Sequence, residues 1–173
     1  EAKGGIDLKA MNGTLTAGTL QALGSIAAAG KDVEMKTVNA GSNLTLTAAN
    51  SLKAADKLTA GGNIAASSTN GNIDINAAEA TGGIIDLKAT NGKLTAAVLQ
   101  AQGSIAAEGK DVEMKQQVIA GKDLTLKAAN SLTTADKLSA DQNMTLTGSD
   151  VTTQKQVTAE KDLTMTASNK LTT

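Results

Sequence analysis

An apolar residue that opens a short alternating stretch recurs along the whole chain, and this repeat constrains the fold more than any other feature. Successive members of the series lie 18 to 21 positions apart. They are Ile6, Ile26, Leu44, Ile64, Ile85, Ile105, Leu124, Met144 and Leu163. Two further apolar series, which begin at Leu15 and Leu20, keep step with the first. A period of this length indicates a solenoid of stacked units.

A longer repeat is superimposed on this period. Residues 6–10 match residues 85–89 at an offset of 79, whereas residues 48–52 match residues 128–132 at an offset of 80. We therefore predict a single solenoid segment over 1–173, cut from a larger protein. It contains two blocks of about 80 residues, 4–82 and 83–162, followed by a partial coil.

The local pattern around each apolar position favours strand over helix. Alternation of the type Leu44-Thr45-Leu46-Thr47 places one set of side chains inward and the other outward. Gly, Asn, Asp and Lys separate these stretches, and no segment keeps a helical i, i+3, i+4 spacing long enough to bury a face. The sequence therefore predicts an all-β parallel β-helix of about nine coils of 19–20 residues, each with three short strands. Coils stacked at about 4.8 Å would give a rod of roughly 40 Å.

Two absences from the composition fit a narrow tube. The chain has no Phe, Trp or Tyr, and an inward aromatic ring would not fit beside Leu and Ile without widening its coil. It also has no Pro, which suits strands that donate hydrogen bonds along an unbroken ladder. We expect the series that begins at Ile6 to form a column in the core.

Asparagine recurs just after the first strand of most coils. The six positions are Asn12, Asn50, Asn70, Asn91, Asn130 and Asn169. Asn and Gly tolerate left-handed backbone conformations, so we interpret these residues as a stacked column of tight turns, with an amide ladder along one corner. The structural role is favoured over a ligand site.

The residue types that carry most enzyme chemistry are missing. The chain has no His or Cys, all 16 of its basic residues are Lys, and the formal net charge is −1. The acids are spread along the chain, so no carboxylate pair for glycoside hydrolysis and no calcium cluster is expected. Outward Thr pairs such as Thr45 and Thr47 are too often interrupted to suggest ice binding. We predict no catalytic, cofactor-binding or metal-binding residue, no enzyme activity, no nucleic-acid partner and no membrane insertion.

Two of the units resemble a known family. Residues Gly41-Ser42-Asn43-Leu44-Thr45-Leu46-Thr47-Ala48 and Gly121-Lys122-Asp123-Leu124-Thr125-Leu126-Lys127-Ala128 are similar to the haemagglutinin repeats of filamentous haemagglutinin-type exoproteins. The resemblance implies a right-handed β-helical shaft in a very large bacterial protein that is secreted by a two-partner pathway. The Asn-Pro motifs of that family's secretion domain are absent, and no binding residue can be carried over.

Three interpretations of function follow from this resemblance. The chain is expected to be a structural shaft segment of a secreted adhesin at the bacterial cell surface, with an outer-membrane transporter as partner during export. The alternatives are the shaft of a contact-dependent growth-inhibition toxin and a carbohydrate- or receptor-binding face on the solenoid itself. Through its parent protein the chain would meet a host-cell receptor or glycan. Uncapped end coils would also favour end-to-end self-association of the isolated segment.

Overall fold

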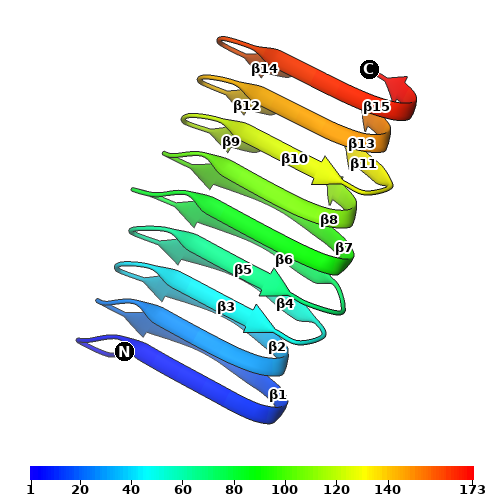
Figure 1. Ribbon diagram of the computed structural model, residues 1–173. Helices are drawn as coiled ribbons and strands as arrows, with labels where there is room; N and C mark the ends of the chain where they lie inside the picture. The colour runs from blue at the N-terminus through cyan, green and yellow to red at the C-terminus, as the bar shows by residue number, and fades with distance from the viewer.

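The computed structural model describes all 173 residues and contains β-strands but no helix (Figure 1). All of the strands belong to one 15-stranded parallel arrangement that winds into a β-solenoid. Its strands are β1 (Ile6–Ala22), β2 (Ile26–Ala40), β3 (Leu44–Ala48), β4 (Leu52–Ala60), β5 (Ile64–Ser68), β6 (Ile73–Ala80), β7 (Ile85–Ala101), β8 (Ile105–Met114), β9 (Val118–Ala120), β10 (Leu124–Ala128), β11 (Ser131–Thr134), β12 (Leu138–Ala140), β13 (Met144–Thr153), β14 (Val157–Ala159) and β15 (Leu163–Thr172).

The predicted first series forms one column through the solenoid. Ile6 pairs with Ile26, which pairs with Leu44, and the pairing continues in register to Leu163. The pairings along this column correspond to about eight turns of the solenoid, and the last coil is incomplete. We call the positions of the three apolar series in each coil its first, second and third stations. In several coils all three stations lie on one bent strand, as in β1 and β7, because pairing between coils continues around the bend.

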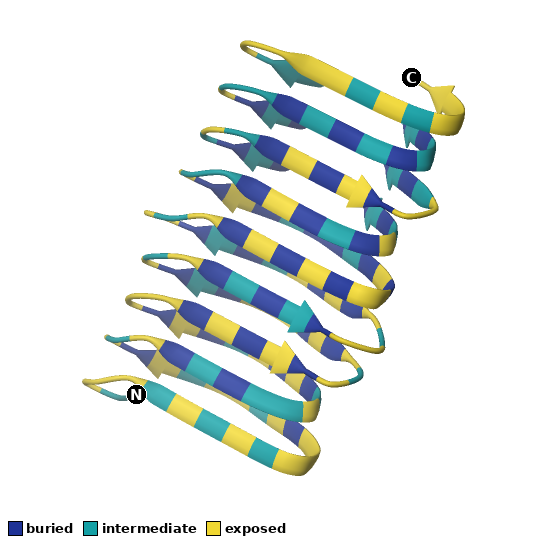
Figure 2. Ribbon diagram, viewed as in Figure 1, coloured by how far each residue is buried: buried dark blue, intermediate teal, exposed yellow.

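The interior is a single stack of aliphatic side chains. A cluster of 43 buried apolar residues runs along the axis, and inward and outward positions alternate on each strand (Figure 2). In β3, for example, Leu44, Leu46 and Ala48 are buried whereas Thr45 and Thr47 are exposed. This alternation is the reason that the period-2 pattern could be read from the sequence.

Seven members of the first column are fully buried, and the two outermost members are not. Ile6 is partly buried, and Leu163 is 45% exposed. Each of these residues has a neighbouring coil on one side only. Burial at these positions therefore depends on stacking rather than on residue type.

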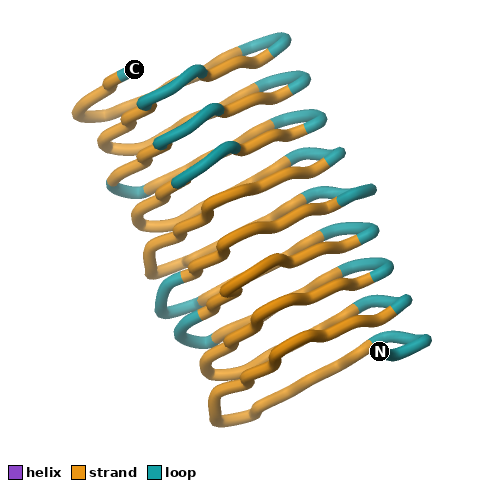
Figure 3. The backbone as a smooth tube through the Cα atoms, turned by 180° about the vertical axis from the view of Figure 1, so that it is seen from behind, coloured by secondary structure: helices purple, strands orange, loops and turns teal.

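Each coil turns at corners that separate its three stations. The first corner lies between the first and second apolar stations of each coil, at residues 11–14, 31–32, 49–51, 69–72, 90–93, 110–111, 129–131, 149–150 and 168–170. The third corner precedes the first station, at residues 23–25, 41–43, 61–63, 81–84, 102–104, 121–123, 141–143 and 160–162. Figure 3 shows the backbone from behind, with loops repeated from coil to coil along the rod.

Most of the variation in coil length is accommodated at the first corner. Three of these corners are only two residues long, and in each the preceding residue is a glycine and the last residue is an aspartate. A Cβ on Gly30 would lie 2.9 Å from the carbonyl oxygen of Asp32, and Gly109 and Gly148 meet the same obstruction at 3.0 Å. Glycine is therefore required here by close approach of the backbone within one coil.

The left-handed explanation of the asparagine column is wrong. No residue in the chain, glycine included, has a positive φ. The first corner turns within ordinary right-handed and extended backbone conformations, so the conformational preference of Asn does not account for its recurrence there.

Candidate functional surfaces

A ladder of polar side chains runs along the third corner, next to the first strands. The side-chain oxygen of each rung accepts a hydrogen bond from the backbone N–H of the equivalent residue in the next coil. Asn63 N–H donates to Asn43 Oδ1 at 2.9 Å, and Ile84 N–H donates to Asn63 Oδ1 at 3.0 Å. The rungs that accept in this way are Ser25, Asn43, Asn63, Ser104, Asp123 and Asn143. We call this set the third-corner ladder.

The ladder has one gap, at Ile84. This side chain is 43% exposed and offers no acceptor, and the backbone N–H of Ser104 in the next coil makes no hydrogen bond. Coil 64–84 carries an extra residue at this corner, which brings Ile84 rather than a polar residue to the rung position. The gap separates the rungs Ser25, Asn43 and Asn63 from the rungs Ser104, Asp123 and Asn143.

Replacing Ile84 by asparagine is expected to stabilise the solenoid. The new Oδ1 would accept the unpaired N–H of Ser104, and a hydrogen bond of this kind contributes about 0.5–1.5 kcal/mol. Thermal and urea unfolding followed by circular dichroism would measure the change. Ile84→Ala is the control, because it removes the exposed side chain without adding an acceptor. If the two variants unfold together, the ladder does not stabilise the fold.

At the first corner, aspartate side chains perform a similar linking role. Asp32 Oδ1 accepts hydrogen bonds from the backbone N–H and hydroxyl of Ser51 at 3.1 and 2.6 Å. The equivalent pair, Asp111 and Ser131, has distances of 3.2 and 2.9 Å. In both cases the aspartate ends a two-residue corner, and its partner lies in the three-residue corner of the next coil. The pair thus joins a short corner to the longer one stacked upon it.

The hydrogen bond from the Ser51 hydroxyl is the main cause that holds the pKa of Asp32 below its ordinary value of 3.8. A lowered pKa in the folded state means that the charged form stabilises the fold. This contribution is fully present above the ordinary pKa and is lost as the pH falls through the folded value.

We therefore expect Asp32→Asn to weaken the dependence of the melting temperature on pH below about pH 4. The amide oxygen can still accept from Ser51, so the melting temperature at neutral pH should change little. Melting curves recorded from pH 2 to pH 7 would test this, with Asp56→Asn as the control because Asp56 accepts no hydrogen bond. If the melting temperature of Asp32→Asn falls below about pH 4 as steeply as that of the unsubstituted protein, the assignment is contradicted.

The six asparagines predicted as a corner column do lie at the first corner, but their side chains form no amide ladder. Asn91 Nδ2 donates to the carbonyl oxygen of Thr69 at 2.9 Å, and Asn169 Nδ2 donates to Asp150 Oδ1 at 2.6 Å. Asn50 contributes weakly to the lowered pKa of Asp32 through its side chain, and the side chains of Asn12, Asn70 and Asn130 donate no hydrogen bond. Sequence reasoning placed the ladder at the wrong corner. The signal for the third-corner ladder was the Asn, Asp or Ser that directly precedes the first strand.

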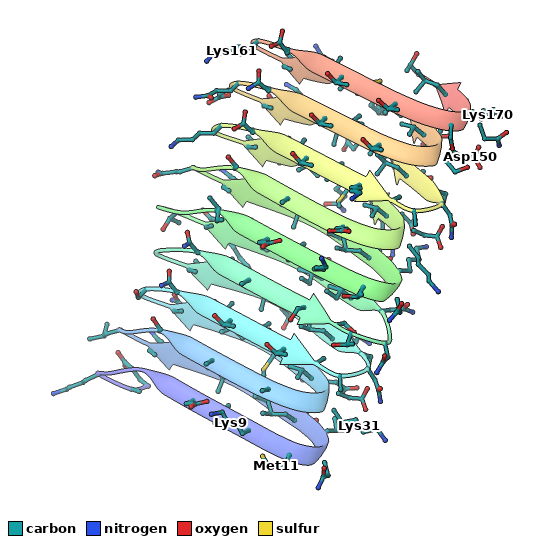
Figure 4. The ribbon with its side chains drawn as sticks, in the orientation of Figure 1. Lys9, Met11, Lys31, Asp150, Lys161 and Lys170 are labelled. Carbon is teal, nitrogen blue, oxygen red and sulfur yellow. The ribbon has the colours of Figure 1, made fainter.

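Charged side chains occupy the outer faces, and four of the five ion pairs link neighbouring coils. Lys88 Nζ lies 3.4 Å from Glu108, and Lys127 lies 3.9 Å from the same carboxylate in the coil beyond. Lys93 pairs with Glu113 at 2.6 Å, and these side chains are roughly one third to two thirds exposed. Pairs as exposed as these contribute little stability. Lys31 and Lys161 form no ion pair and project from the rod (Figure 4).

The hollows on the surface carry no recognisable catalytic arrangement. One of about 590 Å³ lies at the first corner, between Lys9, Met11 and Lys31. Another, of about 430 Å³, lies beside the third corner and is lined by Glu79, Gln102 and Asp141 among others. No group of three potential metal-ligating residues occurs in the chain. No helix that could span a membrane is present either.

Comparison with protein families found one match. The haemagglutinin repeat model matches residues 1–34, 36–80 and 115–173, which is most of the chain. The unmatched stretch includes residues 85–101, which form β7 and repeat much of the sequence of β1 in the matched region. Comparison with curated proteins and with solved structures found no significant match.

Proposed function

The chain belongs to the haemagglutinin repeat family, and on that premise we propose that it is a length of shaft in a large secreted adhesin of the bacterial cell surface. In this role it holds distal domains away from the cell so that they can attach to a surface. Export through an outer-membrane transporter, and contact with a host receptor or glycan through the parent protein, belong to the same proposal.

One observation carries the proposal: a single buried core runs from Leu15 to Val151, and parallel strand pairing joins every coil to the next. The 43-residue cluster has no gap along the axis, and every pair of adjacent first-strand stations is joined in register. Such a rod is elongated and stiff, because each coil is held in place by the coils on both sides of it. The outer faces carry small residues, threonines and weak ion pairs, which suit a spacer that needs only to stay soluble.

Two measurements test the proposal: how firmly the chain holds an attached domain at a distance from the cell, and whether the isolated chain binds a ligand itself. A carbohydrate-binding domain of known specificity would be fused after residue 173 and displayed on a bacterium, with the chain or a flexible linker of equal residue number between it and the cell. The solenoid should hold the domain at a nearly constant distance of roughly 40 Å as force is applied, whereas the flexible linker, with an average span of about 70 Å, should lengthen steadily. Force spectroscopy on a ligand-coated bead would measure the difference. The isolated chain itself should show no saturable binding to cells or to a glycan array. Saturable, specific binding by the isolated chain would overturn the shaft role in favour of a binding face.

A further inference from the structure

The chain contains the tripeptide Thr-Asn-Gly twice, in adjacent coils and at the same corner. One copy is Thr69-Asn70-Gly71 and the other is Thr90-Asn91-Gly92. Asparagine followed by glycine is the sequence most prone to intramolecular cyclisation, because glycine has no side chain to hinder approach of its nitrogen. Since the two tripeptides are identical, any difference in their reactivity must come from the structure around them.

The structure holds the two asparagine side chains differently. Asn91 lies within β7, and its Nδ2 donates a 2.9 Å hydrogen bond to the carbonyl oxygen of Thr69 in the coil below. Asn70 lies between β5 and β6, outside any strand, and is exposed. Its side-chain amide makes no hydrogen bond, and the backbone N–H of Gly71 donates none. Asn70 is therefore free to rotate its side chain toward the Gly71 nitrogen.

We propose that Asn70 is a site of spontaneous deamidation in the folded protein and that Asn91 is protected by its hydrogen bond to Thr69. The Gly71 nitrogen loses its proton and bonds to Cγ of Asn70. The Cγ–Nδ2 bond then breaks, and the nitrogen departs as ammonia, which leaves a succinimide ring. Water opens the ring at either carbonyl carbon and produces aspartate or isoaspartate at position 70.

The modification affects both coils that meet at this corner. Isoaspartate adds a methylene group to the main chain between residues 70 and 71, in a corner that has adjacent coils on both sides. Asn70 N–H donates to the carbonyl oxygen of Ala49 at 2.9 Å in one of those coils, and Thr69 accepts from Asn91 in the other. A longer main chain displaces both bonds. The first reaction therefore weakens the protection of Asn91.

The test is peptide mapping of the whole chain after incubation at neutral to mildly alkaline pH and 37 °C. Trypsin cleaves after Lys57, Lys88 and Lys93, so Asn70 and Asn91 appear on separate peptides, and fragment ions locate the modified residue. In the folded protein we expect initial conversion at Asn70 to exceed that at Asn91 by about fivefold, the factor that corresponds to one hydrogen bond of ordinary net strength.

Two controls make the comparison decisive. In concentrated urea the identical tripeptides should convert at similar rates, because the hydrogen bond to Thr69 is gone. Asn70→Gln should abolish the modification at position 70 on this timescale, because attack on the longer side chain would have to close a six-membered ring, which forms far more slowly, while Asn91 stays protected in the folded state. The asparagine at position 12, which also precedes a glycine and donates no side-chain hydrogen bond, should react as well. Equal rates at Asn70 and Asn91 in the folded chain, or faster conversion of Asn91, would overturn the proposal.

Discussion

Replacing Leu126 by alanine is expected to lower the free energy of unfolding by about 2–5 kcal/mol. Leu126 lies on β10 and is fully buried, with Leu146 and Ala107 as its register partners in the adjacent coils. Truncation would leave a void that neighbouring coils cannot fill, because the hydrogen-bond ladders fix the spacing between coils. Urea unfolding followed by circular dichroism would measure the loss.

The matched control is Thr125→Ala, one residue away on the same strand. Thr125 faces outward and is exposed, so its substitution should change stability by no more than about 0.5 kcal/mol. Because solenoid coils contact only their neighbours, unfolding can begin locally. Hydrogen exchange should therefore show the largest loss of protection in β8, β10 and β13 of the Leu126→Ala variant. Similar stability for both variants would contradict the assignment of Leu126 to the core.

The second large effect is expected for Gly92→Ala at the first corner. A Cβ on Gly92 would fall well inside contact distance of the main-chain carbonyl of Gly71 in the coil below. Since the obstructing atoms belong to the backbone, no side-chain movement can relieve the contact, and adjacent coils must separate there. We expect a loss of about 3 kcal/mol or more, at the upper end for an overpacked site.

Gly18→Ala is a control that is expected to raise the free energy of unfolding rather than lower it. Gly18 lies in β1, and a Cβ there meets no atom within 4 Å. Its φ is not positive, so alanine should be accommodated and should stabilise by about 0.4–1 kcal/mol through the unfolded chain. Thermal melting of the two variants side by side would resolve the difference. A stable Gly92→Ala protein would show that the coils stack less closely than described.

The solenoid could be predicted from the sequence because inward positions had to be apolar and had to recur once per coil. Members of the first column pair in register, and the family match confirms the resemblance seen in units such as residues 41–48 and 121–128. The division into blocks 4–82 and 83–162, and the right-handed sense of winding, stay predictions. A continuous sheet crosses the boundary between the two blocks.

Corner chemistry was harder to predict, because a polar residue in a turn can serve several purposes. Asn70 and Asn43 are the same residue type at two corners of the solenoid, yet only Asn43 accepts a backbone N–H from the next coil. The distinction depends on which side chains stack directly above one another, and this depends on corner lengths that composition does not reveal. Asp32 likewise could be read from the sequence only as a solvated charge, whereas it links two coils through Ser51.

The unequal first corners have a consequence for how such a protein changes over generations. A corner that accommodates two to four residues lets coils of different length share the same three stations, so one-residue insertions leave every other column intact. The bend between the second and third apolar positions also varies by one residue, with two residues between Met35 and Val38 but three between Met114 and Val118, and this changes the offset between the copies from 79 to 80. Unequal recombination between copies of the repeat would add or delete whole coils without breaking the stack. The length of the rod can thus change by whole coils while each remaining coil keeps its fold.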